Sequence, residues 1–153
     1  MITILVGIVI AFVVIAGLYF GILRRANPPL RSGEAKIGTA VFNIEVVSTT
    51  IEQARGLSFR ASLPETSGML FTFGTPGIQN FWMKDMNFPI DIIWIANGKV
   101  VGFAENAMPM PDVALWNLKI YSSPDGTDSV IEVNAGTVAK DNIKVGDSVR
   151  VGI

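Results

Sequence analysis

The sequence begins with a long apolar run that divides the chain into an anchor and a domain. Residues 2–23, ITILVGIVIAFVVIAGLYFGIL, contain no charged side chain. As a helix, a run of this length would extend about 33 Å, which is enough to cross a hydrocarbon core of about 30 Å. Lipid offers the backbone no hydrogen-bonding partner, so a spanning segment of this kind must be helical. The run therefore predicts one transmembrane anchor over residues 1–23.

Two other interpretations fit this run less well. A cleaved signal peptide has a basic N-terminal region, a shorter apolar run and a small-x-small cleavage motif. Here no Lys or Arg precedes the run, and the sequence LYFGILRR at its end contains no such motif. A core helix of a soluble protein would show a polar face, which this run lacks. We therefore expect an uncleaved anchor.

Residues 24–37 are predicted to form a linker. Two prolines favour an extended chain, and Ser32-Gly33 is typical of a flexible joint. Arg24 and Arg25 follow the apolar run directly, and the positive-inside rule would place them and the domain beyond them in the cytoplasm. The other basic residues of the linker are expected to be solvated rather than bound to lipid headgroups.

The remaining residues, 38–153, are predicted to form one acidic domain without a metal or a cofactor. They carry 8 basic and 12 acidic residues, a net charge of −4. A domain of this charge without a basic patch is a poor partner for nucleic acid. The whole sequence contains neither His nor Cys. Their absence excludes a Ser-His-Asp triad, a thiolate nucleophile, a disulfide and zinc held by Cys.

Short stretches of alternating apolar and polar residues predict a mostly β fold of the α+β class. The clearest hairpin flanks Asn97-Gly98, which is a strong signal for a two-residue turn. We expect a single compact antiparallel β domain of six or seven strands. The expected strands are residues 39–47, 69–73, 80–86, 90–96, 99–105, 129–134 and 148–151.

Two short helices are predicted to accompany these strands. Thr50 followed by Gln53 matches the pattern of a capping box and predicts a helix that starts at Ile51. Gly56 is a suitable residue to end that helix. The second helix is expected near Asn142.

Residues 68–95, GMLFTFGTPGIQNFWMKDMNFPIDIIWI, combine a dense apolar pattern with isolated charges. Lys84, Asp85 and Asp91 stand among Met, Phe and Trp residues. Charges in apolar surroundings need a partner or water, because a buried unpaired charge is costly. This segment is the first candidate for a functional site. Residues 108–125 are expected to form a long surface loop, and such loops often serve function.

A series of motifs along the domain carries a family resemblance. It comprises ARGLSFR (54–60), GMLFTF (68–73), NFWMKDMNFPIDIIWI (80–95), VIEVNAGTV (130–138) and IKVGDSV (143–149). In this order and spacing the motifs resemble the family called domain of unknown function 192 (DUF192), from about residue 38 to the end. The resemblance implies a compact, mostly β domain, often found behind a signal peptide or membrane anchor in prokaryotes. It implies no established reaction.

Two positions depart from the pattern of this family. Ser58 stands where Met is common, and Asp85-Met86 stands where Asn-Thr is common. The second departure adds a carboxylate beside Lys84, so a polar network at this place would differ from that of relatives.

The resemblance and the charge pattern together select six candidates for ligand binding. Three of them, Arg55, Lys84 and Asp91, match motif positions, and as a charged cluster they would hold a small anionic or peptide-like ligand. The competing interpretation is an ion-pair network that ties the helix to the sheet. Glu132 is expected on a solvent face or in a pair with a basic residue. The six candidates are Arg55, Trp82, Met83, Lys84, Asp91 and Glu132.

These observations predict a membrane-anchored, non-enzymatic binding or accessory module. The family resemblance places its domain outside the cytoplasm, in conflict with the positions of Arg24 and Arg25. The alternative is a small hydrolase-like enzyme in which Asp85 or Asp91 acts as a general base and Lys84 stabilises negative charge. No catalytic residue, metal or cofactor is assigned, and the sequence identifies no protein partner.

Overall fold

The computed structural model describes residues 30–153. The apolar run over residues 2–23, and with it the predicted anchor, lies outside the described residues. Within residues 30–153, no helix is both long enough and apolar enough to cross a membrane.

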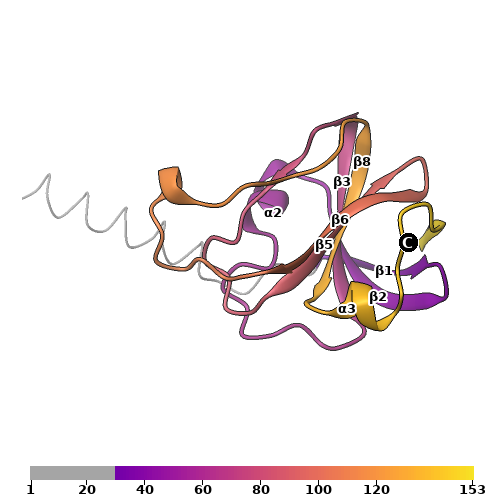
Figure 1. The fold of residues 1–153 in the computed structure, drawn as a ribbon, viewed down its shortest axis with the longest axis horizontal. Coiled ribbons are helices and arrows are strands. Elements are labelled where there is room, and N and C mark those ends of the chain that lie inside the picture. Colours follow the sequence, from indigo (N-terminus) through magenta and orange to yellow (C-terminus); the bar gives the residue numbers. More distant parts are fainter. Residues whose placement is uncertain (1–29) are drawn as a thin grey trace, which may run out of the picture.

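The described part of the chain is mostly β, with two short α-helices and one short 3-10 helix (Figure 1). The helices are α2 (Thr50–Arg55), η1 (Leu115–Asn117) and α3 (Thr137–Lys140). The strands are β1 (Arg31–Ile37), β2 (Ala40–Val47), β3 (Ser67–Gly77), β4 (Asn80–Phe81), β5 (Ile90–Ala96), β6 (Lys99–Ala107), β7 (Tyr121–Ser122), β8 (Thr127–Asn134) and β9 (Val149–Gly152).

Seven of these strands form one curled sheet in the order β6-β5-β8-β3-β2-β1-β9, and β4 and β7 form a separate pair. Neighbouring strands are antiparallel except β2 and β3, which run parallel. The antiparallel pairing expected from the sequence is thus found everywhere in the sheet except at this pair. These two strands are parallel because the connection that carries α2 returns the chain to the starting end of β2 before β3 begins. A bridge between Lys99 and Ser148 links the two edge regions of the sheet and closes the curl into a half-barrel.

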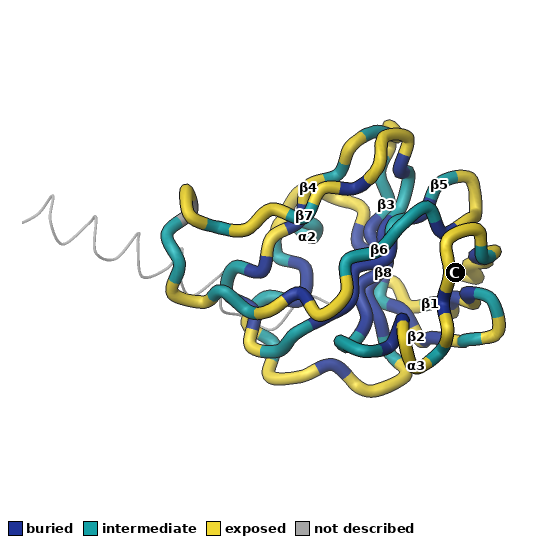
Figure 2. Tube along the Cα trace, in the orientation of Figure 1, coloured by how far each residue is buried: buried dark blue, intermediate teal, exposed yellow. Residues whose placement is uncertain are grey.

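Both faces of the central strands are buried, and each face has its own core. The first core lies inside the curl and draws on all seven strands. The second core lies on the opposite face, toward α2, and includes Met69, Phe71, Ile92 and Val130. Because successive side chains of a strand point to opposite faces, the central stretches of β3, β5 and β8, residues 69–71, 92–95 and 130–133, are mostly apolar. Figure 2 shows the buried stretches concentrated in these central strands, with α2 to one side and the C-terminus to the other.

The predicted hairpin and the end of the predicted helix are confirmed. Asn97 and Gly98 both have positive φ, 51° and 68°, as the two-residue turn between β5 and β6 requires. Helix α2 ends at Gly56, as expected. Its start is one residue earlier than predicted, because the capping box is formed by Thr49 and Glu52 rather than by Thr50 and Gln53.

Two of the boundaries expected from the sequence differ most from the structure. Residues 31–37 belong to strand β1, which pairs with β2 along its whole length, so the linker ends before Arg31. The strand is hard to recognise because only Ala35 and Ile37 of its side chains are buried. The strand predicted over residues 80–86 stops after Phe81, and the chain turns at Asp85, whose φ is 58°.

Candidate functional site

A cavity of about 240 Å³ opens on the second-core side of the sheet, beneath α2. Its walls come from α2 and the turn after it, from β3, β4 and the residues that flank β4, and from β8. Two of its lining residues are ionisable, Arg55 and Glu132. The other lining residues are Thr50, Gln53, Ala54, Gly56, Leu57, Ser58, Phe71, Phe73, Gln79, Asn80, Phe81, Trp82 and Met86.

Helix α2 is fixed above the cavity by its cap and by one long-range hydrogen bond. The Thr49 side chain accepts from the Glu52 N–H, and the Glu52 carboxylate accepts from the Thr49 N–H. The Gln53 Nε2 donates to the Thr72 carbonyl at 2.8 Å, which ties the helix to β3. Gly56 ends the helix with a φ of +49°, and a Cβ at this position would lie 3.3 Å from the Phe71 ring. The close approach of the helix end to β3 therefore depends on glycine.

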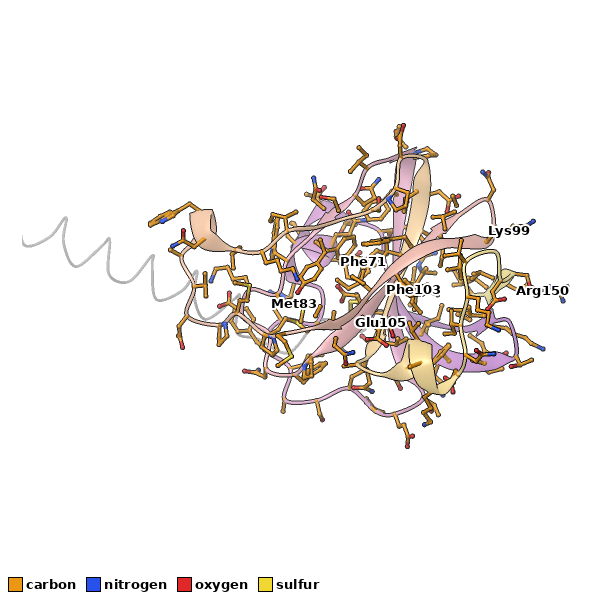
Figure 3. The ribbon with its side chains drawn as sticks, in the orientation of Figure 1. Phe71, Met83, Lys99, Phe103, Glu105 and Arg150 are labelled. Atoms are coloured by element: carbon orange, nitrogen blue, oxygen red, sulfur yellow. The ribbon has the colours of Figure 1, made fainter. Side chains whose placement is uncertain are left out.

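Aromatic rings form one wall of the cavity. The rings of Phe71 and Phe81 meet edge to face with their centroids 5.1 Å apart, and Phe73 meets Phe81 in the same way at 6.4 Å. Trp82 adds a fourth ring and is 46% exposed. Figure 3 shows Phe71 on the side of the sheet where α2 lies. The edge-to-face arrangement fixes the angles between the rings that border the cavity.

Glu132 contributes a buried acid to this cavity. Its position on β8 lies opposite Met69 of β3 and Ile92 of β5, so its side chain points to the second core. The residue is 5% exposed, and within residues 30–153 its side chain makes no hydrogen bond or ion pair. Burial alone raises the pKa of Glu132 to about 8. The carboxyl group is therefore mostly protonated at neutral pH, and the expectation of a solvent-facing or paired residue is wrong.

Asp91 is a structural residue on the opposite face of the sheet. It lies opposite Val133, a member of the first core. Its side chain is fully buried, and its two oxygens accept from the Asn106 N–H at 2.8 Å and the Val138 N–H at 2.9 Å. Asp91 thus joins the end of β6 to the first turn of α3. It does not line the cavity, so its place among the ligand-binding candidates is corrected.

Lys84 and Met83 also lie outside the cavity lining. The Lys84 Nζ lies 3.0 Å from each carboxylate oxygen of Asp85, its neighbour in sequence, and both side chains are about one-third exposed. Met83 is fully buried in the second core. The Lys84–Asp85 pair is local. It does not tie the helix to the sheet, so it is not the ion-pair network that the competing interpretation expected.

A different ion pair connects the segment after α2 to the sheet. Arg60 binds Glu45 of β2 through two hydrogen bonds of 2.8 and 2.6 Å. The hydrogen bonds from Arg60 hold the pKa of Glu45 below its usual value. The two residues are 15 positions apart, and no local pattern in the sequence indicates their pairing.

The structure thus brings together three of the six candidates, Arg55, Trp82 and Glu132. Sequence reasoning missed the phenylalanines and side-chain amides that complete the cavity. One available signal was the position of Glu132 within VIEV, an acid inside a run that is apolar on both faces. Among residues 30–153, no group of three acidic side chains is placed to hold a metal ion.

Substitutions at Asp91 and Lys84 should separate a structural role from a peripheral one. Asp91→Asn turns an amide NH₂ toward one of two buried backbone N–H groups, and we expect it to lower the unfolding free energy by about 2–4 kcal/mol. Lys84→Met removes a partly exposed ion pair and should change the same quantity by less than about 1 kcal/mol. Chemical denaturation of the full chain in dodecyl maltoside micelles measures both. Equal losses in the two variants would contradict this assignment.

The buried acid should make stability depend on pH. Glu132 has a pKa of about 8 when folded and an ordinary pKa of 4.5 when exposed to water, so the folded state holds the proton more tightly. The associated stabilisation is complete below about pH 4.5 and is lost as the pH rises through about 8. We expect wild type to lose a few kcal/mol relative to Glu132→Gln between about pH 5 and pH 8. Denaturation curves of both proteins across this range test the prediction, and parallel curves would refute it.

The sequence of the described domain matches one protein-family model. The family model DUF192, described as "Uncharacterized ACR, COG1430", matches residues 33–151. No curated protein matches the sequence.

Two solved structures are similar to this chain. A protein of unknown function from Novosphingobium aromaticivorans DSM 12444 is 31% identical with a TM-score of 0.71, and the match covers 84% of this chain and 95% of that one. A protein from Sinorhizobium meliloti 1021, described as a candidate transcription regulator, is 26% identical with a TM-score of 0.73, and the match covers 82% and 98% of the two chains. With the family model matched over almost the whole described domain, the chain belongs to the DUF192 family.

Proposed function

We propose that this protein is a membrane-tethered binding module whose ligand occupies the cavity beneath α2. The observation that carries the proposal is Glu132, a buried acid without a partner in the described residues that lines a cavity. An unpaired buried acid lowers stability, and proteins commonly retain such a cost where a site needs it. The surrounding rings and amides provide the mixed apolar and polar lining that is typical of small-molecule sites.

Binding is favoured over catalysis by the separation of the charged side chains. An enzyme built on Lys84 with Asp85 or Asp91 needs both groups within hydrogen-bonding reach of one substrate. The two oxygens of Asp91 accept backbone N–H groups on the far face of the sheet, and Lys84 pairs with its neighbour outside the cavity. The cavity itself offers one acid and one arginine, which suffices for recognition.

The proposed ligand is a small molecule and not a nucleic acid. One structural neighbour is described as a candidate transcription regulator. From residue 38 onward, however, this chain has 8 basic and 12 acidic residues. Contacts with phosphate groups dominate affinity for nucleic acid, and an acidic domain repels phosphate groups. We therefore do not extend a role in transcription to this chain.

The tether is part of the proposal because of the uncharged apolar run over residues 2–23. Its length matches a bilayer, and the family resemblance favours a domain outside the cytoplasm. Arg24 and Arg25 argue for the opposite orientation. We place the domain outside the cytoplasm for two reasons. A run with a short uncharged N-terminus can still act as a signal anchor, and the family resemblance favours a domain behind an export segment.

Blocking the cavity should abolish binding. Ala54 is exposed on α2 and lines the cavity, so Ala54→Trp places a large ring across it. Ile51 is on the same helix, is exposed and does not line the cavity, which makes Ile51→Trp the matched control. We expect compounds from a library of small amines, alcohols and carboxylic acids to shift NMR signals of cavity residues in wild type and in Ile51→Trp. Ala54→Trp should show no such shifts, and equal shifts in both variants would exclude this cavity.

Membrane tethering should be visible in intact bacteria that express the full chain. The protein should remain in the membrane fraction after an alkaline carbonate wash, and protease added to spheroplasts should digest its domain. A variant lacking residues 2–23 should be soluble. A mature protein that begins after the apolar run would indicate a cleaved signal peptide, and protection from protease would place the domain in the cytoplasm.

A further inference from the structure

We infer that the cavity binds a small organic cation, with its ammonium group beside the Glu132 carboxylate and its alkyl groups against the aromatic wall. The inference rests on the proposed function and adds the chemical class of the ligand. It also departs from the small anionic or peptide-like ligand expected from the sequence, because the more buried of the two ionisable residues that line the cavity is an acid.

The charge of the ligand follows from what would compensate Glu132. A neutral ligand could only exchange hydrogen bonds with the protonated carboxyl group, and an anionic ligand would oppose the ionisation of this acid. A cation supplies the opposite charge for this side chain, which has no ion-pair partner among residues 30–153. Ion pairing in a site removed from water is then favourable, because the partner arrives with the ligand.

The aromatic wall supports the same class of ligand. Ring faces carry partial negative charge and attract ammonium groups, more strongly when the site is shielded from water. Phe71, Phe73 and Phe81 are held at fixed angles to one another, and Trp82, the best ring type for this contact, is a half-exposed member of the lining. An acid together with several rings is a favourable lining for an alkylated ammonium group.

Other charged groups near Glu132 do not replace the proposed ligand. Strand β3 has no charged residue, and Asp91 on β5 faces the opposite side of the sheet. Arg55 of α2 lines the same cavity, and the proposal places the ammonium group beside Glu132 rather than beside this like charge. The Lys84–Asp85 and Arg60–Glu45 pairs lie outside the lining, and Glu52 is engaged in the cap of α2.

The cavity size limits the ligand to a few carbon atoms. A volume of about 240 Å³ lies below the range of about 300–1,000 Å³ that is usual for drug-sized ligands. A free amine or quaternary ammonium compound and the headgroup of a lipid share the required chemistry. Their sizes differ, so a titration with both kinds of compound separates the two sources.

Choline and its uncharged isostere 3,3-dimethylbutan-1-ol are the probes of choice. They have nearly the same shape, so a difference in affinity reports the charge. The full chain in dodecyl maltoside micelles is free of competing choline headgroups, and calorimetry gives both affinities. At about pH 8.5 we expect choline to bind at least about tenfold more tightly than the isostere. Glu132→Gln should reduce this preference to about twofold or less.

The pH profile gives an independent readout of the same contact. A cation requires ionised Glu132, so its binding releases a proton at neutral pH. Choline affinity should rise by up to about tenfold per pH unit from about pH 6 to about pH 8 and then level off. The affinity of the isostere should not rise over this range.

Three outcomes would overturn the inference, and a comparison with glycerophosphocholine identifies the source of the cation. Preference for the isostere, or a choline affinity that neither pH nor Glu132→Gln alters, would overturn it. Absence of binding by both probes would overturn it as well. If another compound then binds wild type but not Ala54→Trp, the proposed function still stands without the inference about a cation. Tighter binding of glycerophosphocholine than of choline would support a cationic ligand and identify it as a lipid headgroup. Weaker binding would support a free quaternary ammonium compound or amine.

Discussion

The structure depends on the burial of both faces of strand β8. This strand lies between β3 and β5, and its side chains alternate between the core inside the curl and the core beneath α2. A strand buried on both faces needs two covers. The curling of the sheet provides one, and α2 with the segments around β4 provides the other. The cavity lies where this second cover leaves space above β8.

Two acids on adjacent strands show how strongly environment decides the role of a carboxyl group. Asp91 and Glu132 lie one position apart in the pairing of β5 with β8, so they face opposite sides of the sheet. Asp91 accepts two backbone N–H groups and stabilises the junction of β6 and α3. Glu132 faces a wall of rings and has no partner among the described residues. The first carboxylate is satisfied by the fold, and the second is the group that we propose to bind a ligand.

The sequence located part of the candidate site but not its composition. Arg55, Trp82 and Glu132 line one cavity, whereas Met83, Lys84 and Asp91 do not. The charged residues of the segment 80–95 looked like one cluster because they stand close together in the sequence, and a regular strand was expected over residues 80–86. The positive φ of Asp85 ends that regularity, leaves Lys84 paired with its neighbour and separates it from Asp91. One local turn therefore divides what the linear pattern had joined.

The sequence by itself determined the features that depend on local conformational preference and on periodicity. These are the mostly β class, the Asn97-Gly98 hairpin, the end of α2 at Gly56 and membership of the DUF192 family. Only the tertiary structure decided the parallel pairing of β2 with β3, the inclusion of β1 in the sheet and the burial of Glu132. The parallel pairing and the burial of Glu132 result from contacts between residues distant in the chain, such as Glu132 with Met69 and Ile92, and β1 pairs with the distant β9 as well as with its neighbour β2. Strand register and burial are properties of the assembled sheet, so no local pattern contains them.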